Sequence, residues 1–262
     1  MRANARVFFI GGLIAYRGLF NWIRPAYYIP TMLLGPIFQI LFFAYLGRYS
    51  RSGSDAFFAV GNAVQVSAMA GVFGMALTIG GERWTQTLSP VLASPANRAA
   101  LFLGRALPQV ANGIFVSLVG FAAARVALDF HPRAASLPAL ALVVVVTTVS
   151  CTAFGMAVGA LGLRLRDVFL VANPAYFLML LFCGVNVRLD ALPGWMAAIG
   201  RCLPLTHGIA AARRVASGAS IGDVGTLVGT EIAVGAAWAA VAYLMLRFFE
   251  EESRRRATLD AM

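Results

Sequence analysis

Lysine is absent from this 262-residue chain, whose 21 basic residues are all arginine. The phosphate-binding P-loop of many ATPases needs a lysine to reach the β- and γ-phosphates of the nucleotide. We therefore expect that this chain does not bind ATP through such a loop. The exclusive use of arginine is also typical of bacterial genomes that are rich in G and C.

Charge of either sign is scarce. Charged residues make up 12% of the chain and hydrophobic residues 60%, whereas soluble domains carry about 25% and 45–50%. The apolar residues form blocks long enough to cross the roughly 30 Å of a bilayer core. Because lipid offers no partner to an unpaired backbone group, such spans must be helices. We expect an all-α polytopic membrane protein with one transmembrane domain and six spans: residues 26–47, 56–80, 106–128, 137–162, 168–187 and 224–248.

The arginines are divided unevenly between the two sides of this layout. Six spans place both termini on one side, and that side receives 13 arginines against eight on the other. Cytoplasmic segments carry the excess of basic residues. We therefore expect both termini in the cytoplasm and a multi-pass protein of the bacterial inner membrane.

Residues 2–24 have the pattern of a helix that lies along the membrane surface. At about 100° per residue, Arg2, Arg6, Arg17 and Arg24 share one arc, and aromatic and aliphatic side chains occupy the opposite face. The pattern predicts an interfacial amphipathic helix in the cytoplasmic headgroup layer. A simple lead-in to the first span is the alternative.

Residues 188–223 form a second irregular region, too polar to span the membrane and too apolar for a solvated loop. Trp195 is of the type that is enriched at headgroup depth. The segment predicts two short helices that dip into the outer leaflet as a re-entrant hairpin before the last span. Ser220 and Asp223 have the spacing of a capping box.

The gap after the second expected span is far longer than a turn requires. Residues 82–98 read ERWTQTLSPVLASPANR, and the first seven can form about two turns of helix. Ser94 is a natural N-cap, with Pro95 at the first position of the next helix. A short helix joined to a span in this way suits a docking element, and a solvated connector is the alternative.

Three ordered motifs in this layout resemble those of the membrane subunits of type-2 ATP-binding cassette (ABC) exporters, the class that exports drugs and natural products. They are GERWTQTLSPVLASPANRAALFLGR after the second span, LGLRLRDV with NPAYFLMLLFCGVNVRLDALPGWM after the fourth, and LPLTHGIAAARR before the sixth. The resemblance covers nearly the whole chain. It implies a non-catalytic permease that works as a homodimer or heterodimer in membrane lipid, without nucleic acid, cofactor or metal. ATP and Mg²⁺ would be bound by a separate ABC ATPase subunit, present in two copies.

In that family the segment after the second span is the coupling helix, which seats in a groove of the ATPase. The resemblance implies ATPase contacts by Glu82, Arg83, Trp84, Thr87, Leu88 and Arg98. The short cytoplasmic loop after the fourth span would add Arg164, Arg166 and Asp167. The family often has Gly-Thr-Leu where this chain has Gln86 before Thr87 and Leu88, so the departure falls among the contact residues.

Glu231 is the one carboxylate inside an expected span. Ionisable residues at membrane depth are costly and suggest function. Three interpretations are open: a partner for an outer arginine such as Arg213 or Arg214, a polar point on the substrate path, or a neutral side chain bonded to a neighbouring helix.

Three outer residues join Glu231 as candidates for the substrate path or an outer gate: Trp195, His207 and Arg213. On the last span, Gly225 and Gly229 have the Gly-x-x-x-Gly spacing that allows close approach of helices.

Constellations that could support catalysis or bind a metal are not evident. The three cysteines and two histidines lack metal-ligand spacing, and the GASIG stretch at 218–222 lacks the strand-turn-helix context of a nucleophile elbow. A permease is therefore favoured over a stand-alone membrane enzyme acting on lipid and over a membrane scaffold. We expect export of a hydrophobic or amphipathic drug, natural product or lipid; the alternative is a polysaccharide or lipid-linked glycan, whose exporters line the channel with aromatic residues.

Overall fold

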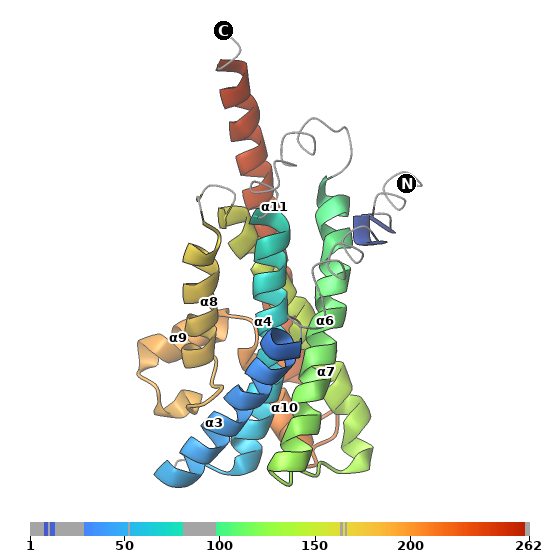
Figure 1. The fold of residues 1–262 in the computed structure, drawn as a ribbon, viewed down its shortest axis with the longest axis vertical. Coiled ribbons are helices and arrows are strands. Elements are labelled where there is room, and N and C mark those ends of the chain that lie inside the picture. The colour runs from blue at the N-terminus through green and yellow to red at the C-terminus, as the bar shows by residue number, and fades with distance from the viewer. Residues whose placement is uncertain are drawn as a thin grey trace.

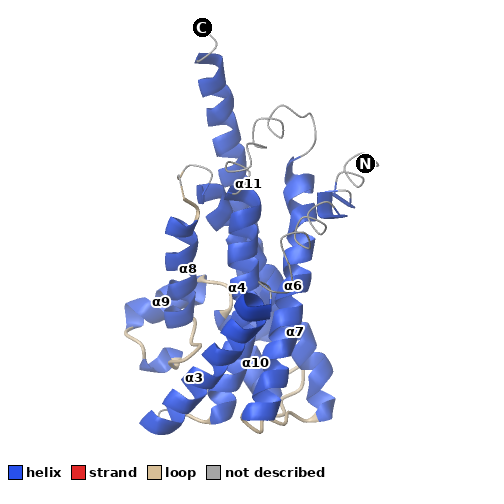
Figure 2. Ribbon diagram, in the orientation of Figure 1, coloured by secondary structure: helices blue, strands red, loops and turns tan. Residues whose placement is uncertain are grey.

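The computed structural model of the chain describes residues 8–9, 11–13, 29–51, 53–80, 98–162, 165 and 167–259. Every regular element in these ranges is helical, and they contain no strand (Figure 2). Most of the expected interfacial helix, residues 81–97 of the long gap, and both Arg164 and Arg166 lie outside the described residues.

Eight α-helices and three short helical segments follow one another along this part of the chain (Figure 1). The α-helices are α3 (Gly35–Ser50), α4 (Asp55–Gly80), α6 (Arg98–Ala127), α7 (Leu137–Gly162), α8 (Phe169–Phe182), α9 (Gly194–Cys202), α10 (Thr206–Ala216) and α11 (Gly225–Leu259). The short segments are the π-helix η1 (Ile29–Leu34) and the 3₁₀ turns η2 (Ala134–Ser136) and η3 (Leu189–Ala191).

Among the residues that the structure describes, four helices are long and apolar enough to cross a membrane: Asp55–Gly80, Leu101–Ala127, Ala134–Gly162 and Gly225–Phe249. The other two expected spans are not among these four. In the first, η1 contributes six residues and α3 sixteen, with Pro36 in the first turn of α3, where a residue without an N–H is tolerated.

The fifth expected span ends early. Helix α8 has 14 residues, which is about 21 Å at the rise of an α-helix and less than the roughly 30 Å of a bilayer core. It stops at Phe182 rather than at residue 187, because Gly184 follows with a positive φ of 76°, the left-handed conformation that ends helices.

Helix α4 lies at the centre of the bundle, packed against α3, α6 and α7, while α11 packs on α7. Glycines set the close approaches. A Cβ added to Gly155 of α7 would lie 2.3 Å from the Gly71 carbonyl oxygen of α4, and one added to Gly235 of α11 would lie 2.4 Å from Ser150 Oγ. The close approach predicted for Gly225 and Gly229 is not seen within the described part of the chain, because a Cβ added to either residue would meet no other atom within 4 Å.

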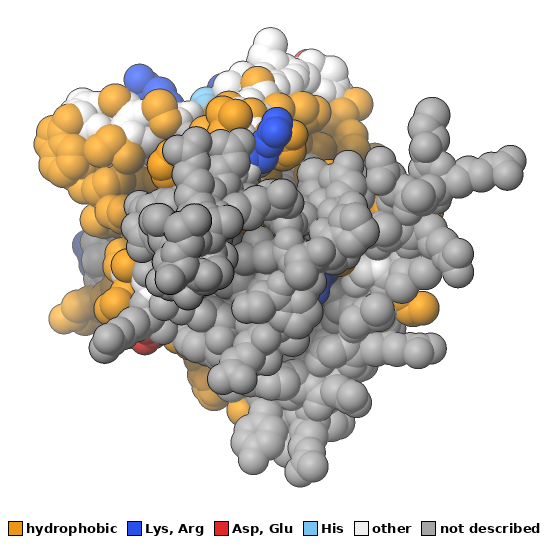
Figure 3. Space-filling model, turned by 90° about the horizontal axis from the view of Figure 1, so that it is seen from above, with side chains coloured by type: hydrophobic (Ala, Val, Ile, Leu, Met, Phe, Trp, Pro, Cys, Tyr) orange, Lys and Arg blue, Asp and Glu red, His pale blue; other side chains and the backbone are white. Residues whose placement is uncertain are grey.

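The helices begin and end at two opposite ends of the bundle (Figure 1). One end holds the C-terminal part of α11, residues 8–13 at the N-terminal side, and the ends of α4 and α6 that flank residues 81–97. The opposite end holds the α3–α4 and α6–α7 turns. Seen from the first end, the described side chains at the margin are largely hydrophobic with isolated arginines (Figure 3), as suits helices in lipid.

Candidate functional site

Residues 183–224 carry α9 and α10 between α8 and α11. We call them the outer hairpin, after the side of the membrane on which the sequence predicts that they lie. The two short helices differ in their surroundings. Helix α9 contacts α8 and η3, whereas α10 packs against α4, α7 and α11. The outer hairpin is thus partly packed into the bundle. Three of the predicted site residues, Trp195, His207 and Arg213, lie in it.

Trp195 and His207 lie on the exposed side of the outer hairpin. The Trp195 side chain is 63% exposed and its ring meets Phe182 edge to face at 5.9 Å. His207 is half-buried, with Nε2 3.2 Å from the Arg201 carbonyl oxygen. An exposed indole of this kind is suited to contact with lipid headgroups.

Glu231 is fully buried (0% exposed), and both its carboxylate oxygens accept main-chain hydrogen bonds from the start of α10. The Leu205 N–H donates to Oε1 at 2.8 Å and the Gly208 N–H to Oε2 at 3.0 Å. Ser150 of α7 donates to the Glu231 carbonyl oxygen at 3.1 Å. Of the interpretations open for Glu231, hydrogen bonding to a neighbouring helix fits these contacts, which come from the start of α10 and not from Arg213 or Arg214.

Arg213 reaches across three segments. Its Nε and Nη2 donate to the Phe57 carbonyl oxygen of α4 at 3.3 and 3.1 Å, while Nη1 donates to Gly184 O and Nη2 to Val185 O, both at 2.7 Å. The guanidinium carbon lies 3.5 Å from the centroid of the Phe57 ring. Arg213 therefore joins α10 to the start of α4 and to the segment after α8.

The predicted coupling residues are only partly placed. Arg98 begins helix α6, and Asp167 is exposed, with its carboxylate accepting a hydrogen bond of 2.9 Å from the Phe169 N–H at the start of α8. The remaining predicted ATPase contacts, Glu82, Arg83, Trp84, Thr87, Leu88, Arg164 and Arg166, lie outside the described residues.

A group of uncharged polar side chains, which we call the amide cluster, lies between α3, α4 and α8. It consists of Gln39, Asn62, Gln65, Tyr176 and Asn186. Gln39 Nε2 donates to Asn62 Oδ1 at 3.1 Å, and Asn62 Nδ2 donates to Asn186 Oδ1 at 2.7 Å. The Tyr176 hydroxyl donates to Gln39 Oε1 at 3.2 Å. These side chains provide one another with hydrogen-bond partners, which lipid cannot supply.

Gln65 is the unusual member of the amide cluster. Its side chain is 0% exposed, and neither amide atom makes a hydrogen bond of regular geometry, although the Tyr176 hydroxyl lies near it. A buried amide without a good partner is costly. This is the type of group that a bound polar atom would satisfy.

Sequence reasoning missed the amide cluster. A signal was present, because Gln39 is an isolated amide in one apolar block and Asn62 and Gln65 are spaced by three in another. That spacing places both on one face of a helix. Only the fold brings Tyr176 and Asn186 to the same place.

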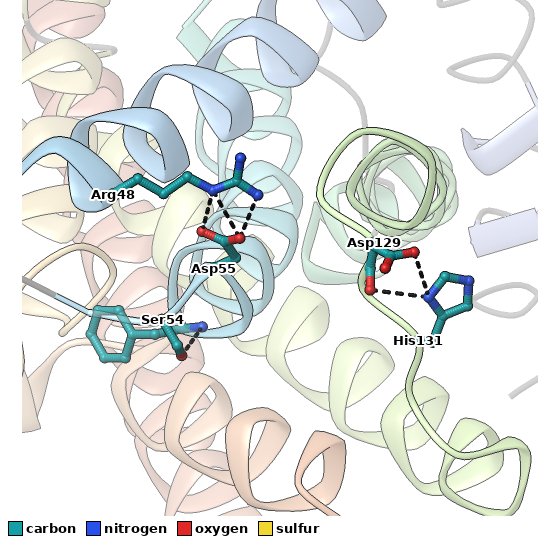
Figure 4. A network of polar contacts seen from close by, with 6 residues as sticks. Arg48, Ser54, Asp55, Asp129 and His131 are labelled. Carbon is teal, nitrogen blue, oxygen red and sulfur yellow. Dashed lines mark hydrogen bonds and ion pairs between the residues drawn. The ribbon is translucent and has the colours of Figure 1, made fainter. Parts of the chain in front are cut away.

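The turns at the end of the bundle opposite residues 81–97 carry short polar contacts (Figure 4). Asp55 accepts from Arg48 Nε at 2.8 and 2.9 Å and so ties α3 to α4, and His131 Nδ1 lies 3.0 Å from the Asp129 carbonyl oxygen. Nearby, the Ser220 N–H donates to Asp223 Oδ2 at 2.8 Å, and the Asp223 N–H donates to Ser220 Oγ at 3.4 Å. The reciprocal contacts of the predicted capping box are thus present, in the turn that precedes α11 rather than in the first turn of the helix.

No group of three metal-ligating side chains occurs in the ranges that the structure describes. Cys151 and Cys183 are buried free thiols, and Cys202 is exposed. The described site thus consists mainly of buried polar groups in an apolar bundle.

The fold is that of a polytopic helical membrane protein. Residues 12–216 match the model of the ABC-2 type transporter family, and because the match covers most of the chain, the chain belongs to this family. The family forms the membrane domain of transporters, is generally non-catalytic and typically partners with an ABC ATPase. No curated protein matches the chain.

Proposed function

We propose that this chain is the permease subunit of an ABC exporter and forms the path for a hydrophobic or amphipathic substrate. The family match over residues 12–216 carries the proposal. In this proposal six spans cross the bacterial inner membrane with both termini in the cytoplasm. Two permease copies, identical or different, work with two ATPase subunits that bind ATP and Mg²⁺.

The arrangement of α4 and α6 supports docking of the ATPase on residues 82–98. Helix α4 ends at Gly80 and α6 begins at Arg98, so the two helices flank the proposed coupling loop. Both also pack against each other in the bundle. A force applied to the loop would therefore reach the centre of the membrane domain without passing through another connection.

The amide cluster supports the class of substrate. Its five side chains carry no formal charge, so a charged substrate would find no counter-ion among them, and desolvating such a charge is expensive. Aromatic rings adjoin the cluster: Phe73 lies 5.4 Å from Tyr176 and 6.3 Å from Phe169, centroid to centroid. Amides next to aromatic rings suit a neutral amphipathic molecule.

A glycan exporter is the second candidate, and one observation favours it. Helix α3 presents four exposed aromatic residues at helical spacing: Phe38, Phe42, Tyr45 and Tyr49. Spacings of four, three and four place them along one face. Such a face can stack sugar rings.

Co-purification tests the proposed function. The chain is expressed with the ATPase encoded beside it, and the complex is isolated through a tag on the permease. We expect the ATPase to be retained, and we expect the combined variant Glu82→Ala, Arg83→Ala, Leu88→Ala to lose it. Arg214→Gln at the outer end is the matched control and should retain it. Failure of any ATPase to bind, or full binding by the triple variant, would contradict the proposal.

Uptake into inside-out vesicles separates the two substrate candidates. The probes are a fluorescent short-chain diacylglycerol, which is neutral, and a lipid-linked oligosaccharide, each with and without ATP. The first candidate predicts ATP-dependent uptake of the diacylglycerol that Gln65→Leu reduces. The glycan candidate predicts uptake of the oligosaccharide that Phe42→Ala reduces, because stacking is worth about 1–3 kcal/mol per ring.

A further inference from the structure

Helix α10 is held at both ends by ionisable side chains: the buried Glu231 carboxyl group at its start and the half-buried Arg213 guanidinium in its last turn. Glu231 of α11 binds the amides at its start, and Arg213 in its last turn binds carbonyls of α4 and of the segment after α8. An ionised Glu231 would also suit the start of α10, as the Arg213 cation suits its end, since an anion is favoured at a helix N-terminus and a cation at the C-terminus.

The start of α10 is fixed by more than the carboxylate. Leu205 has a positive φ of 93°, an uncommon conformation for a residue with a side chain. A Cβ added to Gly208 would lie 2.0 Å from Thr147 Oγ1 of α7, so this first turn is pressed against α7. The surroundings therefore hold the Leu205 and Gly208 amides facing Glu231.

The C-terminal end of α10 is packed just as closely against its neighbours. A Cβ added to Gly61 of α4 would lie 2.5 Å from both Arg213 Nη2 and the Val185 carbonyl oxygen. The four hydrogen bonds that the Arg213 guanidinium makes all go to main-chain carbonyls. Because main-chain atoms move only with their segments, these bonds tie α10 to the body of α4 rather than to a side chain.

We propose that α10 is a rigid connecting helix, which we call the crossbar, and that it transmits displacement of α4 to the outer ends of α8 and α11. Arg213 and Glu231 are its positioning residues. Helix α4 runs unbroken from Asp55 to Gly80, about 39 Å at 1.5 Å per residue. Its last residue adjoins the coupling loop, and Phe57 in its first turn meets Arg213. The proposal rests on the proposed function, because the ATPase supplies the displacement.

A native thiol reports on the crossbar. Cys183 is buried beneath the start of α10, with Sγ 3.6 Å from the Pro204 carbonyl oxygen. Opening of the outer hairpin would expose it to a membrane-impermeant maleimide. Cys202 is exposed, so the parent for the experiment is the complex that carries Cys202→Ser.

The experiment measures the labelling rate of Cys183 in the permease–ATPase complex, without nucleotide and with ATP and vanadate. We expect the rate in the parent to change between the two states. Arg213→Gln and Glu231→Gln should each raise the nucleotide-free rate about tenfold, the effect of losing a charged hydrogen bond on a local opening. Arg213→Gln should also abolish the nucleotide response while ATP hydrolysis continues, and Arg213→Lys should restore part of it.

Matched controls sit beside each residue. Arg214→Gln and Thr230→Val change exposed neighbours on the same helices and should label as the parent does. A parent rate that ignores nucleotide, or an unchanged nucleotide response in Arg213→Gln, would overturn the crossbar. An ATPase that does not bind at all contradicts the proposed function instead, and the nucleotide-free rates of the Gln variants then still decide whether the two tethers hold the hairpin.

Discussion

Gly235 of α11 has no side chain, and Ser150 of α7 packs into the space that a side chain would occupy. Such contacts hold together a bundle in which lipid is as apolar as the helices, so close packing replaces the hydrophobic effect. Buried polar groups follow the same logic: Asn62 is useful because two neighbouring amides bond to it. Each of these effects belongs to one residue and can be tested there.

Gly235→Ala should destabilise the protein, whereas Gly229→Ala on the same helix should not. The added methyl at 235 would lie 2.4 Å from Ser150 Oγ and 3.0 Å from its Cα, while the one at 229 meets nothing within 4 Å. Overpacking of this kind costs about 1–3 kcal/mol, and alanine at an open helix position is favourable by roughly 0.5–1 kcal/mol. Thermal unfolding in detergent compares the two variants; equal midpoints would refute the packing argument.

Asn62→Ala and Gln65→Leu should have opposite effects on stability. Removing Asn62 leaves the Gln39 and Asn186 amides without their partner, a loss of roughly 1–3 kcal/mol. Gln65 lacks a regular hydrogen bond, so a leucine of similar size removes a penalty and should leave the protein as stable or more so. Thermal unfolding measures both. A larger loss for Gln65→Leu than for Asn62→Ala would show that Gln65 is well paired.

At the scale of elements, short polar contacts at the ends of helices decide where each one begins and turns. Asp167 binds the first N–H of α8, Asp55 of α4 holds Arg48 of α3, and Ser220 pairs with Asp223 before α11. Outside the spans these contacts are in water, so their strength depends on pH.

The capping box before α11 should weaken in acid. Hydrogen bonds from the Ser220 side chain, and then from its backbone, lower the pKa of the Asp223 carboxyl below its usual value. A lowered pKa in the folded protein means that the contribution is present above the unfolded pKa of about 3.9. It is lost as the pH falls through the folded value.

The carboxyl carbon shift of Asp223, followed through an acid titration by NMR, checks this prediction. Ser220→Ala should move the midpoint upward, because the main donor is gone. Ser217→Ala, which removes a nearby hydroxyl that bonds to Arg214 O instead, should leave it in place. Identical midpoints in all three proteins would mean that Ser220 does not stabilise the carboxylate.

On the scale of the whole molecule, the sidedness of the bundle joins the two proposed ends of the mechanism. The ends of α4 and α6 that flank residues 81–97 lie at the same end as the C-terminal part of α11, and the outer hairpin lies nearer the other end (Figure 1). An ATPase that acts on one end and a hairpin that responds at the other would need the bundle to cross the membrane in one defined direction.

Thiol labelling of intact cells checks this direction. The native Cys202 on α9 is exposed and should react from outside with an impermeant maleimide. A Ser89→Cys variant in a Cys202→Ser background should react only after the cells are permeabilised. Labelling of position 89 from outside would invert the topology and remove the proposed ATPase site from the cytoplasm.

The sequence by itself determined the helical membrane class, the family and the capping box, because these depend on composition, on ordered motifs and on contacts between residues three apart. It could not give the early end of α8, where the fold uses the left-handed Gly184, nor the open surroundings of Gly225 and Gly229. Only the tertiary structure decided the partners of Glu231 and Arg213. Both bind main-chain atoms, which every residue possesses and no sequence pattern marks, and these atoms meet the two side chains only once α10 has packed among α4, α7 and α11.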